Sequence, residues 1–391
     1  MRVVELIAYH VRIPLRKPIR HASHTRTESD NLLVVCQLAD GTRGYGEGVP
    51  RDYVTGETIG SALELLRRSD LAGFCAEHDP HDFAAAVAAA ERLTLAAVPD
   101  DPRRCRGNAA RCAVELALLD AYGRQFGQPV AAVTRLLAED LWQPRDRVRY
   151  SGVITSAAGF KARVAAWVMR LYGFRHCKVK VGLAGQDDVK RLATIRKRVG
   201  AMMDLRVDAN EAWPPDAAAE RIRALEPFGI SAVEQPVAHE HVAALAEVRR
   251  QVRTPIMLDE SLCGLVDAEH AVKDRTCDLF NLRLSKCGGF IPSLRLAQFA
   301  RRHGLGYQLG CQVGETAVLS AAGRHFACSV KDLRYAEGSY DRRLVRARLS
   351  RQDLTFGYGG WAPALPGPGL GIEIDESALA RVTVRNEVLL G

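Results

Sequence analysis

Long apolar runs are missing from this chain of 391 residues. No run approaches the roughly 20 apolar residues that a membrane-spanning helix needs, so we expect no membrane partner. Charged and polar side chains interrupt the first residues, at Arg2, Glu5, His10 and Arg12, so we expect no cleavable secretory leader. The ten cysteines form no Cys-x-x-Cys pair and show no regular spacing, which is typical of reduced, buried thiols. These absences together predict a cytoplasmic protein.

Long basic runs are missing as well. The chain has 54 Lys and Arg against 46 Asp and Glu, a formal charge of +8, but the basic residues are dispersed and are mostly arginine. We therefore expect no nucleic-acid partner. Hydrophobic content of 47% and charged content of 26% are those of an ordinary globular protein. The length suits a barrel accompanied by a smaller domain.

One short stretch, Cys177 to Gly182, contains two lysines placed two residues apart. Successive side chains of a strand point to opposite faces, so Lys178 and Lys180 share one face. Two ammonium groups at this separation repel each other, and either they bind an anion or one of them loses its proton easily. On the spacing alone, an exposed lysine pair on a solvated edge strand is the commoner explanation.

Four further strand-like runs end in a charged side chain. These are Asp208, Glu234, Asp259 and Lys286, and together with Lys180 they recur every 25 to 28 residues. One strand, one helix and two loops need about this length, so the period predicts a repeated βα unit. If the strands are parallel and close into a barrel, their C-terminal ends lie on one face, where such enzymes keep their chemistry. Three carboxylates would then meet there, flanked by lysines.

Residues 1–145 are predicted to form an α+β section without such a constellation. We expect a strand over 1–16, a polar loop over 17–30 and a hairpin turning at Asp40-Gly41 between strands 32–38 and 44–49. Helical spacing appears at 57–68, 81–93 and 108–126, and Asn108 is the expected N-cap of the last. The glycines of 44–48 lack the GxGxxG spacing of a dinucleotide loop, so we interpret them as a strand exit.

The repeated βα units are predicted to occupy residues 146–355. Its strands should end near Ile154, Lys180, Asp208, Glu234, Asp259, Lys286, Gln312 and Glu337, with the clearest helices at 186–199, 214–226, 240–251 and 314–327. Residues 356–391 are rich in glycine and proline and end in a strand-like run over 381–390. We expect this C-terminal segment to pack back on the first section.

The charged residues occur in short motifs whose order is characteristic of one family. They are Lys178-Val-Lys180, Val-Asp208-Ala-Asn210, Glu234-Gln-Pro, Asp259-Glu-Ser and Lys286-Cys-Gly-Gly. In this the sequence resembles the enolase superfamily, specifically the muconate lactonizing enzyme (muconate cycloisomerase) subgroup of the mandelate racemase/muconate lactonizing enzyme family. The resemblance covers nearly the whole chain. It implies an α/β fold, a modified (β/α)7β TIM barrel behind an N-terminal α+β capping domain, and a homo-oligomer.

The resemblance also implies a reaction, the removal of a proton α to a substrate carboxylate to give an enediolate. Asp208, Glu234 and Asp259 would bind Mg²⁺, with Mn²⁺ able to replace it. Carboxylate oxygens suit octahedral Mg²⁺, and the absence of cysteine and histidine among the three disfavours zinc. Three carboxylates, one divalent cation and two protonated lysines leave the site positive, so we expect an anionic small-molecule substrate whose carboxylate sits on the metal.

Roles for the lysines follow from the same resemblance. Lys180 would be the base on one face of the substrate, and Lys286 would act from the opposite face as acid, base or electrostatic partner. Lys178 would assist Lys180 and contact the substrate carboxylate. Taken singly, the acidic residues could be helix N-caps and Lys286 a solvated loop lysine. Their joint occurrence favours the catalytic interpretation.

Other polar residues are candidates for the surroundings of the site. Asn210, Gln235 and Glu260 adjoin the expected metal ligands. The capping loops 19–25 and 49–55 are expected to cover the barrel mouth. The candidates for substrate contact, from these loops and from the ends of the seventh and eighth strands, are His21, His24, Arg51, Tyr53, Gln312 and Glu337.

The substrate is less well defined by the sequence. Dipeptide epimerases of the subgroup hold the substrate's amino group with an Asp-x-Asp motif at the eighth strand, where this chain has Tyr335-Ala-Glu337. The seventh strand ends in Gly310-Cys-Gln312 and lacks the methionine of those epimerases. We therefore expect a small carboxylate without a required free α-amino group. Muconate cycloisomerase-like isomerisation is the leading hypothesis. Racemisation or epimerisation of an amino-acid derivative, o-succinylbenzoate synthase-like dehydration and a catalytically silent binding barrel stay open as alternatives.

Overall fold

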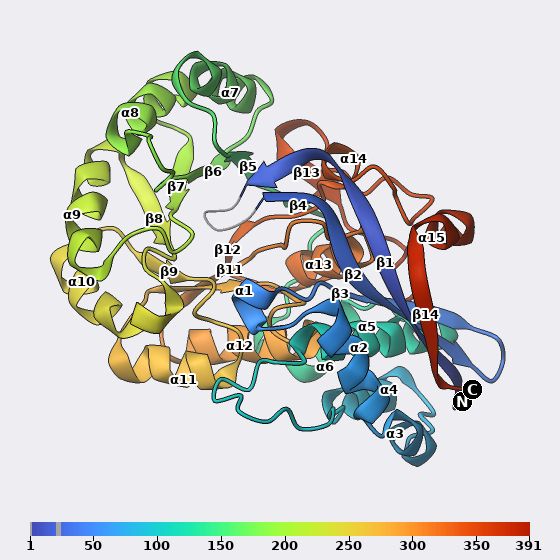
Figure 1. The fold of residues 1–391 in the computed structure, drawn as a ribbon. Helices are drawn as coiled ribbons and strands as arrows, with labels where there is room; N and C mark the ends of the chain where they lie inside the picture. Colours follow the sequence, from blue (N-terminus) through green and yellow to red (C-terminus); the bar gives the residue numbers. More distant parts are fainter. Residues whose placement is uncertain (1, 21–24) are drawn as a thin grey trace.

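A computed structural model describes residues 2–20 and 25–391 of the chain. A four-stranded antiparallel sheet in the order β14-β1-β2-β3 forms one side of the molecule (Figure 1). Its strands are β1 (Val3–Arg20), β2 (Thr25–Leu38), β3 (Arg43–Gly48) and β14 (Thr383–Leu390). Because β14 pairs with β1, the last residues of the chain lie beside the first, and Figure 1 shows the two termini together.

The polar loop expected over residues 17–30 is wrong for the described residues of that range. Strand β1 continues to Arg20 and β2 starts at Thr25, with Pro14 paired to Glu28 and Ile19 to Arg26. Polar composition misled the prediction because this end of the ribbon leaves one face exposed, and antiparallel strands tolerate a polar outer face. Backbone pairing between the two strands, rather than side-chain hydrophobicity, holds the extension.

The glycines of β3 allow a helix to approach the sheet closely. Helix α5 (Asn108–Gln125) lies across β3 with a row of alanines, and a Cβ added at Gly46 would fall 1.8 Å from the carbonyl oxygen of Ala113. A Cβ at Gly44 would meet Ala117 and Ala121 backbone atoms in the same way. The glycine alternation therefore belongs to the strand itself and serves helix packing. The other helices of this section are α1 (Asp52–Thr55), α2 (Ile59–Arg68), α3 (Leu71–Glu77), α4 (Phe83–Glu91) and α6 (Ala132–Leu137).

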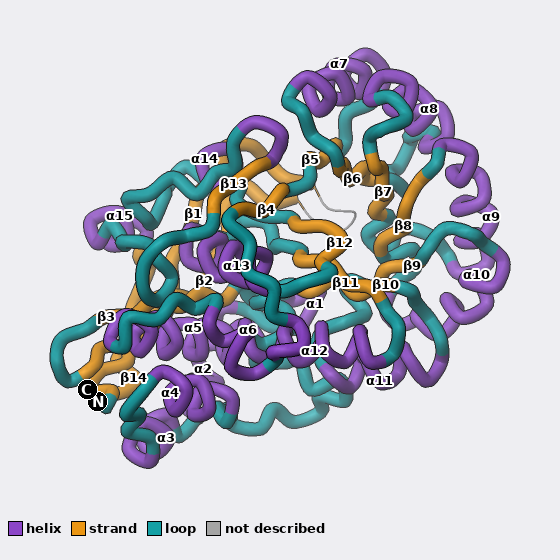
Figure 2. The backbone as a smooth tube through the Cα atoms, turned by 180° about the vertical axis from the view of Figure 1, so that it is seen from behind, coloured by secondary structure: helices purple, strands orange, loops and turns teal. Residues whose placement is uncertain are grey.

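The second part of the chain contains eight parallel strands in one curled sheet, as predicted. Their order follows the sequence: β5 (Gly152–Ile154), β6 (His176–Lys180), β7 (Asp204–Asp208), β8 (Ile230–Glu234), β9 (Ile256–Leu258), β10 (Leu279–Leu282), β11 (Gly306–Leu309) and β12 (Leu333–Ala336). Ser151 N donates to Ala336 O at 2.8 Å, which joins the two ends of the curl. The strands are short and almost wholly buried, and helices form a ring outside them (Figure 2).

Two of the ring helices begin at recognisable signals. Asp187 accepts a hydrogen bond from Lys190 N at the start of α8, and a proline opens α9. The bounds are α7 (Gly159–Leu171), α8 (Asp188–Val199), α9 (Pro215–Leu225), α10 (Leu245–Gln251), α11 (Leu265–Asp274), α12 (Phe290–Arg302) and α13 (Ala317–Ser329). Two short helices, α14 (Asp341–Leu344) and α15 (Glu376–Val382), and the strand pair β4 (Arg147–Arg149) and β13 (Trp361–Pro363) complete the fold.

Two local expectations need correction. Asn108 is the first residue of α5 and not its N-cap, which is Gly107. Lys286 does not end a strand, because β10 stops at Leu282 and a turn follows. The division of the chain at residues 145 and 355 stays a prediction. Within residues 2–20 and 25–391, no helix combines the length and the apolar character needed to cross a bilayer.

Candidate active site

Strand register places three predicted site residues in one row. In the parallel ladder Lys180 is paired with Asp208, and Asp208 with Glu234. Asp259 follows directly after the next strand, β9. Residues paired in this way project to the same side of a sheet. The row therefore runs along the C-terminal ends of β6 to β9. Its three carboxylates, which we call the carboxylate row, are those of Asp208, Glu234 and Asp259, and all are fully buried.

Lys178 lies behind this row and is enclosed by carboxylates. Its Nζ lies 2.8 Å from Glu337 Oε2, 3.2 Å from Glu234 Oε1 and 3.3 Å from Asp208 Oδ2. Lys180 is more exposed, with its Nζ 3.2 Å from Asp208 Oδ2 and donating to Asn210 Oδ1. The two lysines thus share a face as predicted, but Lys178 is held by three protein carboxylates, whereas Lys180 contacts one and is more exposed.

Lys286 reaches the opposite end of the row. Its Nζ donates to Asp259 Oδ1 at 2.9 Å, to Asp259 O at 2.6 Å and to Asn281 O at 2.9 Å, and the side chain is fully buried. Asn108 Nδ2 donates to Lys286 O and to Cys263 O, each at 2.7 Å. The first turn of α5 therefore fixes the turn that carries Lys286. The role of Asn108 was missed because its partners are distant in sequence.

Two buried arginines also belong to the site and were missed. The guanidinium of Arg283 donates to Asp259 and lies 3.6 Å from Glu234 Oε1. That of Arg206 donates to Glu337 and, at 3.2 Å, to Ser151 Oγ. Arg206 stands two residues before Asp208 on β7, so the alternation of that strand offered a signal for it. Arg283 follows the end of β10, where no such alternation applies.

Asn210, Gln235 and Glu260 lie next to the row and form hydrogen bonds around it. Asn210 and Gln235 have positive φ values of 43° and 36°, a conformation that costs free energy in residues other than glycine. Gln235 Oε1 accepts from Asp259 N at 2.9 Å and from Ser261 N at 3.1 Å, so it orients the segment carrying Asp259. Asn210 Nδ2 donates to Glu260 Oε1 at 3.4 Å. These three candidates do surround the row.

A cavity of about 180 Å³ opens above the row. The cavity brings seven of the predicted site residues together with Arg26 of the capping section, whereas Lys286, Gln235 and the three carboxylates are buried outside its lining. Its polar lining includes Arg26, Tyr53, Lys178, Lys180, Asn210, Glu260, Arg283, Gln312 and Glu337. Arg51 instead donates to Ser29 Oγ at 2.6 Å and to Val313 O at 2.8 Å, joining β2 to the segment after β11. His21 and His24 lie outside the described residues.

Burial and ion pairing move the pKa values of the row in opposite directions. Burial alone would raise the pKa of Asp208, but the ammonium groups of Lys180 and Lys178 lower it below its usual range. Burial and the neighbouring Asp208 carboxylate raise the pKa of Glu234 to about 8. Burial opposes the charged form of Lys286, yet Asp259 raises its pKa. The pKa of Lys178 is raised in the same way, chiefly by Glu234 and Glu337.

The donor set fits a hard divalent cation in its chemistry. All three row carboxylates are buried, and Asp208 Oδ2 accepts no hydrogen bond within the described residues, where its contacts are the ion pairs with Lys178 and Lys180. Oxygen donors without sulfur or imidazole are those of Mg²⁺ sites. No three His, Cys, Asp or Glu side chains are already gathered around one point in residues 2–20 and 25–391. Lys178 bridges Asp208 and Glu234, and Arg283 bridges Glu234 and Asp259.

Comparisons with known proteins agree with this geometry. Residues 3–134 match the family described as the mandelate racemase / muconate lactonizing enzyme N-terminal domain, and residues 160–378 match the enolase C-terminal domain-like family. N-succinyl-L-Arg/Lys racemase of Bacillus cereus is 28% identical over 100% of both chains. Chloromuconate cycloisomerase of Cupriavidus pinatubonensis is 31% identical over 71% of this chain and 73% of its own.

A solved dipeptide epimerase from Cytophaga hutchinsonii, complexed with Mg and D-Ala-L-Val, superimposes with a TM-score of 0.84 at 25% identity and covers 100% of both chains. Relatives that match the whole length or nearly so include this racemase and this epimerase. They also include a solved muconate lactonizing enzyme from Pseudomonas fluorescens, which covers 98% of this chain and 99% of its own at 27% identity with a TM-score of 0.82. Cycloisomerisation is therefore not specifically favoured. Family match, barrel and site order lead to one conclusion: the chain belongs to the enolase superfamily and is an isomerase of that superfamily.

Proposed function

We propose that this chain is a Mg²⁺-dependent racemase or epimerase of an N-acylated amino acid. The observation that carries the proposal is the placement of Lys180 and Lys286 at opposite ends of the carboxylate row. Lys180 contacts Asp208, the first residue of the row, and Lys286 contacts Asp259, the last. Two ammonium groups facing each other across a substrate can deliver a proton to either face of its α-carbon. Inversion of configuration needs both, whereas a cycloisomerase needs one.

The preference for an N-acylated substrate rests on Glu337. A free α-ammonium group needs an anionic partner when it leaves water. Glu337 stands at the eighth strand, where such a partner is expected, but it is already bound by Lys178 at 2.8 Å and by Arg206. The N-succinyl racemase among the relatives supports the same choice. The neutral amide nitrogen of an N-acylated substrate needs no buried counter-ion.

The far end of the substrate would face the capping section. Arg26 lines the cavity, and its Nε is buried without a hydrogen-bond partner among the described residues. Its guanidinium lies 5.4 Å from the ring centre of Tyr53 and 3.7 Å from Asp52 Oδ1. We infer that the acyl oxygen or a second carboxylate of the substrate accepts a hydrogen bond from Arg26.

These positions assign a separate role to each residue of the site. Asp208, Glu234 and Asp259 would hold the Mg²⁺, which when bound stabilises the negative charge that develops on the substrate carboxylate. Lys180 would remove the α-proton of one enantiomer and Lys286 that of the other. In each direction the other lysine, in its protonated form, would deliver a proton to the opposite face of the α-carbon and so invert its configuration. Gln235 would keep Asp259 in place through its two backbone contacts.

The test is α-proton exchange in deuterated water, followed by NMR on each enantiomer of N-succinyl amino acids. We expect Lys180→Ala and Lys286→Ala to lower racemisation by about 10²–10⁴-fold each. Each variant should retain deuterium exchange on one enantiomer only, and on opposite enantiomers. Lys190→Ala is the matched control, because that lysine is exposed and pairs with Asp187 outside the cavity.

The opposite result is equally specific. If exchange disappears in Lys180→Ala but survives on the same substrate in Lys286→Ala, one lysine moves the proton, and a cycloisomerase or dehydratase replaces the racemase. Undiminished turnover in Lys180→Ala would overturn the proton-abstraction mechanism as a whole. Efficient epimerisation of dipeptides with free amino groups would overturn the substrate class.

A further inference from the structure

Helix α7 presents its large apolar side chains outward. Phe160 is 69% exposed, Trp167 48% and Leu171 63%, whereas the side facing the barrel carries Ala162 and Ala166, both 0% exposed. A surface helix normally turns its apolar stripe toward the core and its polar side to water. Here the order is reversed. The helix lies at the outer edge of the molecule, packed mainly against α8 and β5 (Figures 1 and 2).

The exposed side chains form a narrow seam. Phe160, Val164, Trp167 and Leu171 are spaced by four, three and four residues, and Val168 lies beside them. Alternating steps of three and four give one stripe along a helix, the pattern through which two helices pair. The spacing reads the same from either end, so an identical seam running in the opposite direction can match it.

The seam continues beyond the end of α7. Tyr358 is 70% exposed, and its ring lies 5.7 Å from that of Tyr172, which follows the helix. Side chains of this size have surfaces of roughly 150–250 Å². From the exposed fractions, the seam with Tyr358 offers about 600 Å² on one subunit, and two such surfaces would bury about 1,200 Å², the lower end for a stable interface.

We propose that α7 pairs antiparallel with α7 of a second copy of this chain about a two-fold axis. The symmetric register sets Phe160 against Leu171 of the partner subunit and Val164 against Trp167 of the partner subunit. Each large side chain thereby meets an apolar counterpart, and the bulky indole lies opposite a small valine. A two-fold interface of this kind uses the same surface on both subunits.

The charges flanking the seam predict how the pairing responds to salt. Lys161, Arg163 and Arg170 border the seam, and α7 contains no acidic residue. In a pair of identical helices these cations stay at the solvent rim and repel one another weakly. Added salt screens that repulsion, so raising NaCl from about 50 to 500 mM should tighten the dimer. An acidic protein or an anionic lipid surface would show the reverse dependence.

The primary experiment is sedimentation velocity of the full chain. We expect a concentration-dependent self-association whose dissociation constant rises at least about 30-fold in Trp167→Glu. Val388→Glu is the matched control, because Val388 is also apolar and 65% exposed but lies on β14. It should associate as the unmodified chain does. Circular dichroism and enzyme activity are measured to check that both variants fold.

A second experiment tests the register. Val164→Cys and Trp167→Cys, mixed and oxidised, should give a disulfide-linked dimer in high yield, whereas neither variant alone should do so. A chain that stays monomeric at all concentrations overturns the proposal, as does association unchanged in Trp167→Glu. Binding of the monomer to phosphatidylglycerol vesicles without self-association would assign the seam to a membrane surface and also overturn it.

Discussion

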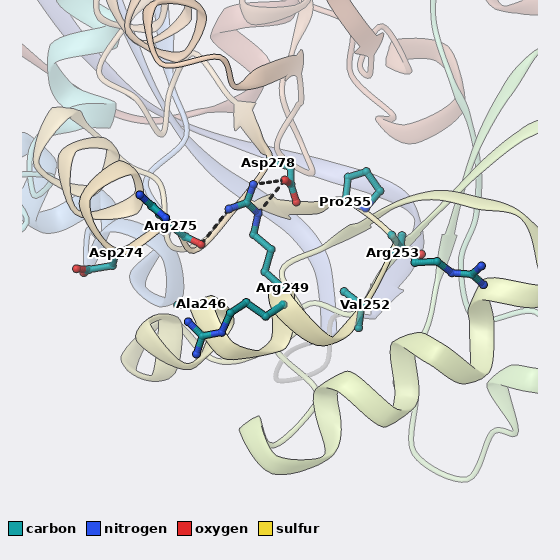
Figure 3. A pocket seen from close by; sticks show the side chains of 10 residues that line it. Ala246, Arg249, Val252, Arg253, Pro255, Asp274, Arg275 and Asp278 are labelled. Atoms are coloured by element: carbon teal, nitrogen blue, oxygen red, sulfur yellow. Dashed lines mark hydrogen bonds and ion pairs between the residues drawn. The ribbon is translucent and has the colours of Figure 1, made fainter.

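The two ends of the barrel strands contain the same kinds of charged residue in different surroundings. At the C-terminal ends, lysines, arginines and carboxylates are almost completely buried around the row. At the N-terminal ends, a groove of about 370 Å³ is lined by Arg249, Arg250, Arg253, Arg275, Asp274 and Asp278 together with neighbouring apolar residues. Figure 3 shows Arg249 held between Asp278 and the carbonyl of Arg275, while Arg253 points away.

The difference shows that exposure, rather than the number of charges, decides what a cluster can do. Arg253 is 89% exposed, so water and salt screen its pairing with Glu226. Arg206 is 0% exposed, and its pairing with Glu337 takes place in a medium of low dielectric constant. Each buried charge needs a partner of opposite charge. A cluster of such pairs therefore responds strongly when one more ion or a charged substrate binds.

The largest effect is expected at the row. Asp208→Asn removes a carboxylate that we assign to Mg²⁺, so metal affinity and turnover should fall more than about 100-fold, the upper end for residues that only orient a ligand. Calorimetric titration with Mg²⁺ measures the affinity directly. Asp278→Asn, in the groove, is the control and should change neither. Unchanged Mg²⁺ affinity in Asp208→Asn would remove the row from the metal assignment.

The next effect concerns stability. Arg206→Ala leaves Glu337 with one of its two cationic partners and should cost about 3–5 kcal/mol of unfolding free energy. Arg249→Ala breaks the half-exposed pair with Asp278 and should cost at most about 1 kcal/mol. Urea denaturation of both variants measures the two values under one condition. Equal costs would show that burial does not separate the two ends of the barrel.

A pH effect of intermediate size is expected from Glu47. Burial raises its pKa to about 7 from an ordinary 4.5, although hydrogen bonds from Thr316 and Leu319 oppose the rise. A pKa raised in the folded state gives a stabilisation that is present below pH 4.5 and is lost as pH rises through about 7. Unfolding free energy should therefore fall by about 1–3 kcal/mol between pH 5 and pH 8, and by less in Glu47→Gln.

Glu247, beside the groove, provides the contrast for this pH series. It is exposed, and a hydrogen bond from Arg250 lowers its pKa, so its contribution has the opposite sign. Glu247→Gln should leave the pH profile of stability as it is. A profile flattened by Glu247→Gln and unaffected by Glu47→Gln would reverse the assignment of the titrating group.

The smallest effect belongs to the groove surface. Arg250 is 70% exposed and pairs with Glu247 one turn earlier on the same helix. Arg250→Ala should change unfolding free energy by less than about 0.5 kcal/mol. The same urea titration measures it. A cost above 2 kcal/mol would mean that the groove is closed to water in solution.

The barrel could be predicted from the sequence because its signals are local and repeated. Each strand brings its own charged terminus, and the spacing of Lys180, Asp208, Glu234 and Asp259 follows from one strand, one helix and two loops. Lys286 fits the spacing for a different reason. Strand β10 ends at Leu282, and the following turn folds back so that the lysine reaches Asp259. The spacing therefore located Lys286 correctly, although this lysine lies in a turn and not at the end of a strand.

Long-range contacts escaped the sequence analysis. Arg206 and Glu337 are separated by 131 residues, and Asn108 and Lys286 by 178. Lys286 and Glu337 were candidates by their positions, but nothing local indicates that Arg206 pairs with Glu337 or that Asn108 holds the turn of Lys286. The extension of β1 and β2 was missed for a similar reason, since cross-strand pairing overrides polar composition. Tertiary partners decide such cases, and one sequence does not contain them as a pattern.

The register that aligns Lys180, Asp208 and Glu234 also determines where the gene can change length. Adding or deleting one residue within β6, β7 or β8 would turn that strand's charged terminus to the other side of the sheet and remove it from the row. The loops after these three strands have no such alternation to preserve, unlike the turn after β10, which carries Lys286. Insertions in the loops after β6, β7 and β8 can reshape the cavity walls and leave Lys180 and Lys286 in place. Length variation between descendants of this chain should therefore concentrate in those loops, and substrate range should vary with it.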